Sequence, residues 1–213
     1  QNSVGGTALM LAALFNHPAV VLRLLRAGAD TKLRSAKGES ALQLSKEKGH
    51  AECVEAFRQH IAEEVAANHR EAAAGGAGGA SSGEAASSGS FGSLPEAAAV
   101  AILQGDEAAL LAWLDNGGQV NVIHGAVTAL MGVAQEGHER AVELLLQRGA
   151  EVNQQTSDGW TALLFAAGAG HERVVELLVL RGAEVDKQDG DGLSALMGAA
   201  SQGHERVIEL LLQ

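Results

Sequence analysis

The chain has 213 residues, of which 46% are hydrophobic, and its formal net charge is −11. Because no run of about 18 uninterrupted apolar residues occurs, the sequence contains no candidate transmembrane helix. Its single cysteine, Cys53, excludes an internal disulfide framework and predicts an intracellular setting, cytoplasmic or nuclear. The first residues include neither Met nor a basic leader segment, so we expect a portion upstream of Gln1 to be missing.

The charge is unevenly distributed along the chain. Residues 1–72 hold 9 Lys and Arg against 8 Asp and Glu, whereas residues 73–213 hold 6 against 18. An acidic surface repels phosphate groups, so the second part predicts neither nucleic acid nor an anionic membrane as a partner.

A period of 33 residues runs along the chain. A Thr or Ser followed by Ala-Leu recurs in phase, and a histidine stands ten positions after it each time. The anchors are Thr7, Ser40, Thr128, Thr161 and Ser194, and the histidines are His17, His50, His138, His171 and His204. Several independent landmarks that keep one phase indicate a repeat protein.

The clearest unit begins at Thr161 and predicts two helices. Thr161 can cap a helix over 162–169, which Gly170 ends because glycine tolerates a positive φ. A second helix over 172–181 presents an apolar stripe, and the polar residues 184–191 form a loop to the next unit. One unit cannot bury its own stripe, so the units must stack.

These landmarks resemble those of ankyrin repeats, whose unit is a turn, two antiparallel helices and a projecting β-hairpin loop. The closest match runs over 158–167, followed by Gly170-His171 and Leu177-Leu178. The family's Thr-Pro-Leu-His reads Thr-Ala-Leu-Met or similar here, without the proline and the capping histidine. The resemblance implies an all-α solenoid of about six units, two of them truncated by the chain ends, and covers nearly everything outside 62–93.

In chain order, residues 1–73 contain two units. They are predicted to be the last part of a first array of repeats. The unit at Ser40 resembles a capping repeat, because its first helix carries the polar run Lys46, Glu47 and Lys48. Its second helix is expected to continue through 62–73, since Ile61-Ala62 stands where Gly-Ala belongs.

Residues 74–93 follow as a predicted flexible linker, because 75–93 contains 7 Gly, 6 Ser and 4 Ala. Residues 94–213 are then predicted to form a second array of four units, the last one incomplete. Those units are anchored at Glu96, Thr128, Thr161 and Ser194. A single solenoid with a long inserted loop is the alternative arrangement.

The residues that could bind a metal ion or act in catalysis are predicted to have structural roles instead. Stacked helices lie about 8–10 Å apart, so equivalent histidines cannot share one zinc ion, and we expect them to bond locally between the helices of each unit. Cys53 occupies a core position of the repeat and predicts a small buried side chain. We find no nucleophile motif and no kinase or dinucleotide signature, so the sequence predicts no enzyme activity, cofactor or metal.

The candidate partner-binding residues come from the resemblance, because ankyrin-like proteins bind partners along hairpin tips and the inner face of the first helices. The matching positions are Val127, Gln135, Glu136, Ser157, Asp158, Trp160, Asp191, Leu193, Ser201 and Gln202. Val127, Trp160 and Leu193 share one repeat position and predict an apolar stripe on an acidic concave face, with Trp160 as its anchor. Packing of Trp160 across adjacent hairpins is the alternative.

The predicted function is a monomeric, non-catalytic scaffold for protein–protein interaction, with a basic peptide or basic protein surface as its partner. The competing hypothesis is a regulatory or autoinhibitory segment of a larger enzyme or channel, packed on its own chain.

Overall fold

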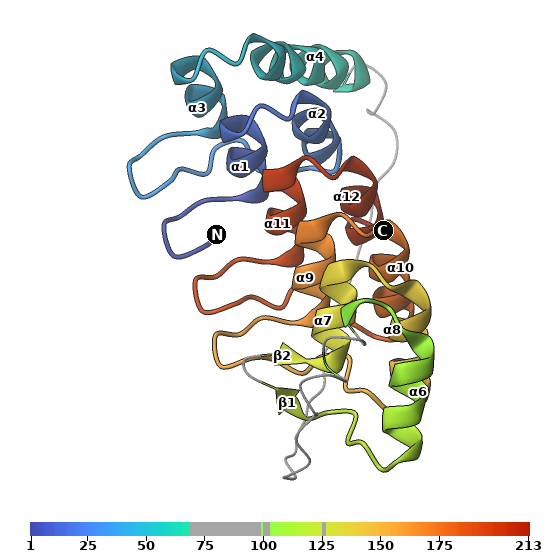
Figure 1. The fold of residues 1–213 in the computed structure, drawn as a ribbon. Helices are drawn as coiled ribbons and strands as arrows, with labels where there is room; N and C mark the ends of the chain where they lie inside the picture. The colour runs from blue at the N-terminus through green and yellow to red at the C-terminus, as the bar shows by residue number, and fades with distance from the viewer. Residues whose placement is uncertain (69–98, 100–102, 125–126) are drawn as a thin grey trace.

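A computed structural model describes residues 1–68, 99, 103–124 and 127–213 of the chain. These residues form eleven helices and one two-stranded sheet, arranged as a solenoid of two-helix layers (Figure 1). The all-α repeat architecture predicted from the sequence is therefore confirmed. Within the described residues, no helix combines the length and apolar character that crossing a membrane would need.

Each complete layer pairs a first helix with a second helix. The first helices are α1 (Ala8–Leu14), α3 (Ala41–Glu47), α7 (Ala129–Glu136), α9 (Ala162–Ala169) and α11 (Ala195–Gln202). The second helices are α2 (Pro18–Arg26), α4 (Ala51–Asn68), α6 (Glu107–Asp115), α8 (Glu139–Gln147), α10 (Glu172–Leu180) and α12 (Glu205–Leu211). Loops between layers project past the first helices, and we call that side of the stack the hairpin side (Figure 1).

Local sequence signals explain where the helices begin and end. The Thr161 hydroxyl accepts a hydrogen bond of 3.2 Å from the Leu164 backbone N–H, which caps α9 as expected. Gly170 ends α9 in the left-handed region with φ of 82°. Helix α10 ends at Leu180, one residue before the predicted end. Helix α4 continues to Asn68, and the rest of its predicted extension lies outside the described residues.

The core lies between the two helices of each layer and between neighbouring layers. Small residues on the first helices are fully buried and let these helices approach closely: Ala12, Ala13, Ala166, Ala167, Ala199 and Ala200. Larger apolar side chains from both kinds of helix fill the space between them: Leu25, Leu110, Leu130, Met131, Leu145, Leu163, Leu178 and Ile208.

The layers stack in an order that differs from the order of the chain. From one end to the other, the second helices follow as α6, α8, α10, α12, α2 and α4 (Figure 1). Helix α1 accordingly packs against α11, although almost the whole chain separates them. The predicted division into 1–73, 74–93 and 94–213 stays a prediction, because residues 69–98 lie outside the described part.

Regular strand pairing is limited to one loop in the part of the chain that the structure describes. Strand β1 (Ile123–His124) pairs antiparallel with β2 (Val127–Thr128), with Ile123 opposite Thr128. Elsewhere in the described loops, a single bridge joins Gln188 to Ser194.

Candidate partner-binding surface

The recurring histidines connect neighbouring layers. Nε2 of His171 lies 2.8 Å from the Gln135 carbonyl oxygen, and Nε2 of His204 lies 3.1 Å from that of Gly168. Nε2 of His17 and of His138 makes the same contact with the carbonyls of Ser201 and Leu103, whereas His50 contacts the Ala13 carbonyl through Nδ1. The expectation that these side chains bond locally was wrong. Carbonyls in the last turn of a helix lack partners within that helix, and the imidazole from the adjacent layer reaches them.

Potential metal-binding and nucleophilic residues are also accounted for. Within the described residues, no group of three or more His, Cys, Asp or Glu side chains is arranged to hold a metal ion. Cys53 is fully buried, as predicted, and its thiol lies 3.5 Å from Oδ1 of Asn16. Burial, together with the nearby Glu52 carboxylate, raises the Cys53 pKa to about 11. The thiol therefore stays protonated at neutral pH and packs as a core residue.

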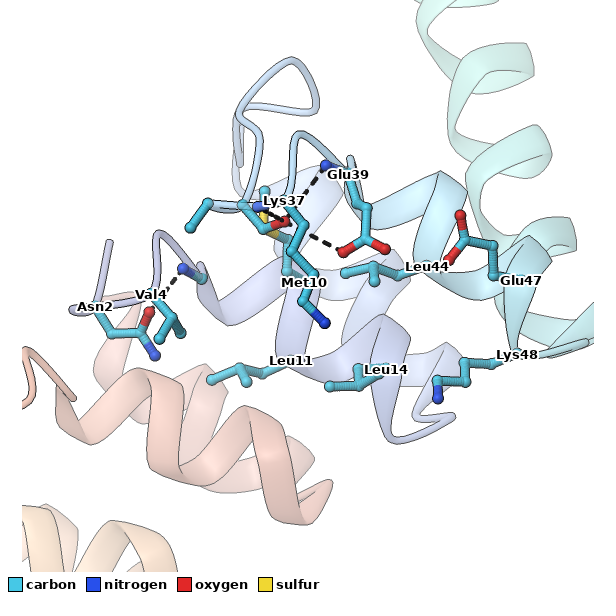
Figure 2. Close-up of a pocket in the computed structure, with 13 residues that line it drawn as sticks. Asn2, Val4, Met10, Leu11, Leu14, Lys37, Glu39, Leu44, Glu47 and Lys48 are labelled. Carbon is cyan, nitrogen blue, oxygen red and sulfur yellow. Dashed lines mark hydrogen bonds between the residues drawn. The ribbon is translucent and has the colours of Figure 1, made fainter.

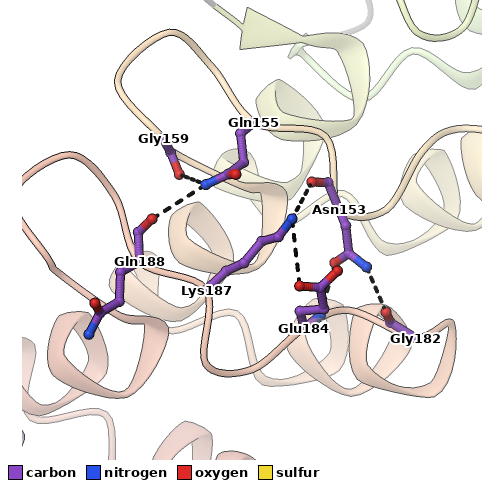
Figure 3. Close-up of polar contacts among 7 residues, drawn as sticks. All are labelled: Asn153, Gln155, Gly159, Gly182, Glu184, Lys187 and Gln188. Atoms are coloured by element: carbon purple, nitrogen blue, oxygen red, sulfur yellow. Dashed lines mark hydrogen bonds and ion pairs between the residues drawn. The ribbon is translucent and has the colours of Figure 1, made fainter. Parts of the chain in front are cut away.

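Polar side chains tie the projecting loops to one another. Asn153 donates from Nδ2 to the Gly182 carbonyl at 3.0 Å and accepts from the Glu184 N–H at 2.8 Å (Figure 3). Lys187 reaches the Asn153 carbonyl at 3.5 Å and pairs with Glu184 at 3.6 Å. Asn121 repeats the asparagine contacts one layer earlier, with the Gly149 carbonyl and the Glu151 N–H. The loops thus hold their positions relative to the layers beneath them.

Trp160 packs within its own layer. Its ring centroid lies 5.0 Å from that of Phe165, with 32° between the ring planes, and its side chain is half-buried against the core. Its backbone N–H donates to the Thr156 hydroxyl at 3.0 Å, which fixes the turn before α9. A role for Trp160 as an anchor for a partner stays a prediction.

The other candidate residues belong to the layers of α7, α9 and α11. Three of them are half-buried, at the base of the loops or on α11: Val127, Leu193 and Ser201. The other six are exposed, at loop tips or at the ends of α7 and α11: Gln135, Glu136, Ser157, Asp158, Asp191 and Gln202. These residues come from the loops and first helices of three consecutive layers, and their role in binding stays a prediction.

The sequence prediction missed a groove on the hairpin side of residues 1–48. A cavity of about 510 Å³ opens between helices α1 and α3 and the two loops that precede them (Figure 2). Leu11 and Leu14 of α1 and Leu44 of α3 line it, and Met10 lies beneath them, almost fully buried. Val4 enters from the first loop and is 61% exposed.

Charged side chains of both signs surround this apolar groove. Lys37 and Glu39 come from the second loop, and Glu47 and Lys48 come from the end of α3 (Figure 2). An apolar floor with a polar rim is the usual composition of a small binding site.

A sequence signal for the groove does exist. Leu11 and Leu14 stand four and seven positions after their anchor Thr7, where the unit at Thr128 has Gly132 and Gln135. The unit at Ser194 has Gly198 and Ser201 at the same two positions. Large apolar residues at both positions distinguish the first unit from the units at Thr128, Thr161 and Ser194, the second of which has Phe165 and Gly168 there.

Comparison with known proteins agrees with this architecture. A family model described as ankyrin repeats (3 copies) matches residues 2–75, 98–189 and 130–213. No curated protein matches the chain.

Proposed function

The chain belongs to the ankyrin repeat family, and we propose that it is a non-catalytic scaffold whose hairpin side binds an extended segment of a partner protein. Ankyrin repeats generally mediate protein–protein interaction. The observation that carries the proposal for this chain is the apolar groove between α1 and α3.

The order of the layers supports a partner with a defined pattern. Next to the groove lies the layer of α11, followed by those of α9 and α7. In the first two of these layers, an exposed acidic residue stands in the loop three positions before the anchor of the unit, namely Asp191 and Asp158. Layers about 10 Å apart match roughly three residues of an extended chain. The proposed ligand is an apolar residue in the groove, followed by basic residues at every third position.

Binding of labelled synthetic peptides to the full chain tests this proposal. A peptide with a leucine and lysines at every third position is compared with a scrambled peptide by fluorescence polarisation. Leu11→Ser combined with Leu14→Ser is expected to weaken binding at least about tenfold, because the apolar contact is lost. The matched control is Leu180→Ser on α10, which removes a 74% exposed leucine outside the groove.

The acidic residues have a separate test. Asp158→Asn combined with Asp191→Asn is expected to reduce the salt dependence of binding, because exposed charge pairs are screened by salt. Glu139→Gln combined with Glu172→Gln on the second helices is the matched control. The proposal is wrong if peptide affinity is the same for the ordered and scrambled peptides, or if it survives the groove variant unchanged.

A further inference from the structure

The junction between α11–α12 and α1–α2 has the same contacts as the junctions between consecutive repeats. Nε2 of His17 lies 3.0 Å from the Ser201 carbonyl oxygen, as His204 does from that of Gly168. The Ser3 N–H donates to the Asp191 carbonyl at 2.7 Å. One layer away, the Gly190 N–H donates to the Asp158 carbonyl at the same distance. The surfaces of these two segments are therefore complementary in the way that adjacent repeats are.

An ion pair adds to this complementarity on the second helices. Arg23 of α2 pairs with Glu209 of α12, and their side chains are 39% and 24% exposed. The pair joins residues from opposite ends of the sequence, and Glu209 pairs as well with Arg206 of its own helix.

No loop carries the chain directly across this junction. At the other described junctions between complete layers, a loop connects one layer to the next, whereas here α12 precedes Gln213 and α1 follows Gln1. The covalent connection runs through residues 69–102 instead. In the sequence, these residues stand between α4 and α6, and the layers of α4 and α6 lie at opposite ends of the stack (Figure 1).

The covalent connection between the two segments begins and ends at layers that are far apart in the stack. Six layers at about 8–10 Å each separate the ends of the stack by roughly 40–50 Å. The covalent connection between the two segments therefore does not hold the two surfaces of the junction next to each other. A second copy of the chain can then compete for the same surface.

An open hollow of about 270 Å³ runs along the junction at the surface of the stack. Leu9, Leu24 and Leu33 line it from one segment, and Leu196 and Leu212 line it from the other. Leu33 and Leu212 are each 39% exposed, so apolar surface of both segments meets solvent here.

We propose that this junction is a self-recognition surface, on which the α1–α4 segment of one copy docks against α11–α12 of a second copy. The contacts between the two segments are identical in the closed monomer and in the exchanged dimer, and only the path of the connection differs. Exchange of an identical element between copies is a low-cost route to a dimer.

Two complementary charge-reversal variants of the full chain test this proposal. In Arg23→Glu, two glutamates face each other at the junction, and in Glu209→Arg two arginines do. A dimer of one copy of each variant again joins an arginine to a glutamate at both of its junctions, but only if segments are exchanged between the copies. We expect mixing to raise the dimer fraction about fivefold per junction over either variant alone, as measured by native mass spectrometry.

The matched control reverses an ion pair at a junction that a loop does cross. Arg181 and Glu143 lie 3.9 Å apart between adjacent layers, and mixing Arg181→Glu with Glu143→Arg is expected to leave the dimer fraction the same as for either variant alone. If mixing raises the dimer fraction equally in this control, the rise does not depend on the proposed junction and the proposal is overturned.

A second measurement uses the unsubstituted chain and does not depend on variants that fold. Ordinary and ¹⁵N-labelled copies are unfolded together and refolded at high and at low concentration. The proposal predicts dimers of mixed isotopic mass at high concentration. It is overturned if neither this mixture nor the charge-reversal mixture contains a dimer with one copy of each kind.

Discussion

The layers of residues 1–68 and those of residues 127–213 have the same skeleton and different surfaces on the hairpin side. Helices α1 and α9 are both capped by a threonine hydroxyl, and both bury two consecutive alanines. On the hairpin side, α1 presents Leu11 and Leu14, where α9 has Phe165 and Gly168. Positions that contact the next layer are constrained by stacking, whereas positions that face outward are free to carry binding specificity.

The largest expected effect tests the common skeleton by comparing two equivalent core leucines. Leu24 and Leu178 stand 17 positions after their anchors and are 2% and 0% exposed. Leu24→Ala and Leu178→Ala are each expected to reduce the free energy of unfolding by about 3 kcal/mol, because each leaves a cavity in the core. Urea denaturation measures both. A much smaller loss for Leu24→Ala, or a separate unfolding transition for residues 1–68, would break the comparison.

Glycines at the helix ends provide the next test. Gly170 and Gly49 have φ of 82° and 73°, so alanine is strained at both positions. A Cβ on Gly170 would lie 2.5 Å from the His204 ring, whereas a Cβ on Gly49 meets nothing within 4 Å. We expect Gly49→Ala to reduce stability by about 1 kcal/mol and Gly170→Ala by roughly 2–3 kcal/mol. Equal losses in thermal unfolding would show that the histidine contact does not constrain Gly170.

A smaller difference is expected in the loops. Asn153 bonds to both Gly182 and Glu184, whereas the equivalent position in the second unit is the exposed Lys32. Asn153→Ala is expected to reduce stability by about 1–2 kcal/mol, because it leaves backbone groups without their partners. Lys32→Ala is expected to change it by less than about 0.5 kcal/mol. Chemical denaturation of both variants tests whether loop contacts differ between the two regions.

The smallest effect concerns the ion pair that joins α2 and α4 at one end of the stack. Arg26 of α2 holds Glu63 of α4 at 2.7 Å, and this hydrogen bond lowers the pKa of Glu63 from 4.5 to about 2. Because the pKa falls on folding, the pair stabilises the folded chain above about pH 4.5. That contribution is lost as the pH falls towards 2. An NMR titration of the Glu63 carboxyl carbon with a midpoint near 4.5 would contradict the assignment.

The sequence was sufficient to predict the repeat and its local structure. Thr161 and Gly170 mark the bounds of α9 because capping and a positive φ depend on neighbouring residues only. The stacking order was not predictable in this way. Each histidine meets the same kind of helix end in the preceding layer, so the pattern does not specify that His17 contacts Ser201. Periodicity defines the unit, whereas the choice of neighbour depends on contacts that are distant in sequence.

The groove illustrates a second limit. Leu11 and Leu14 differ visibly from their counterparts in later units, but a cavity also requires the neighbouring loop and α3 to leave space. The sequence prediction instead weighted the tryptophan, whose ring proved to be packed against Phe165.

The position of α1 next to α11 has a consequence for synthesis on the ribosome. The α1 surface emerges early, but the helix that covers it is completed only when residue 202 has been translated. At about 5–20 residues per second, the apolar face of α1 waits roughly 9–38 s for that helix. During this interval the nascent chain exposes residues of α1 that are buried in the mature fold, which makes this helix a target for chaperones.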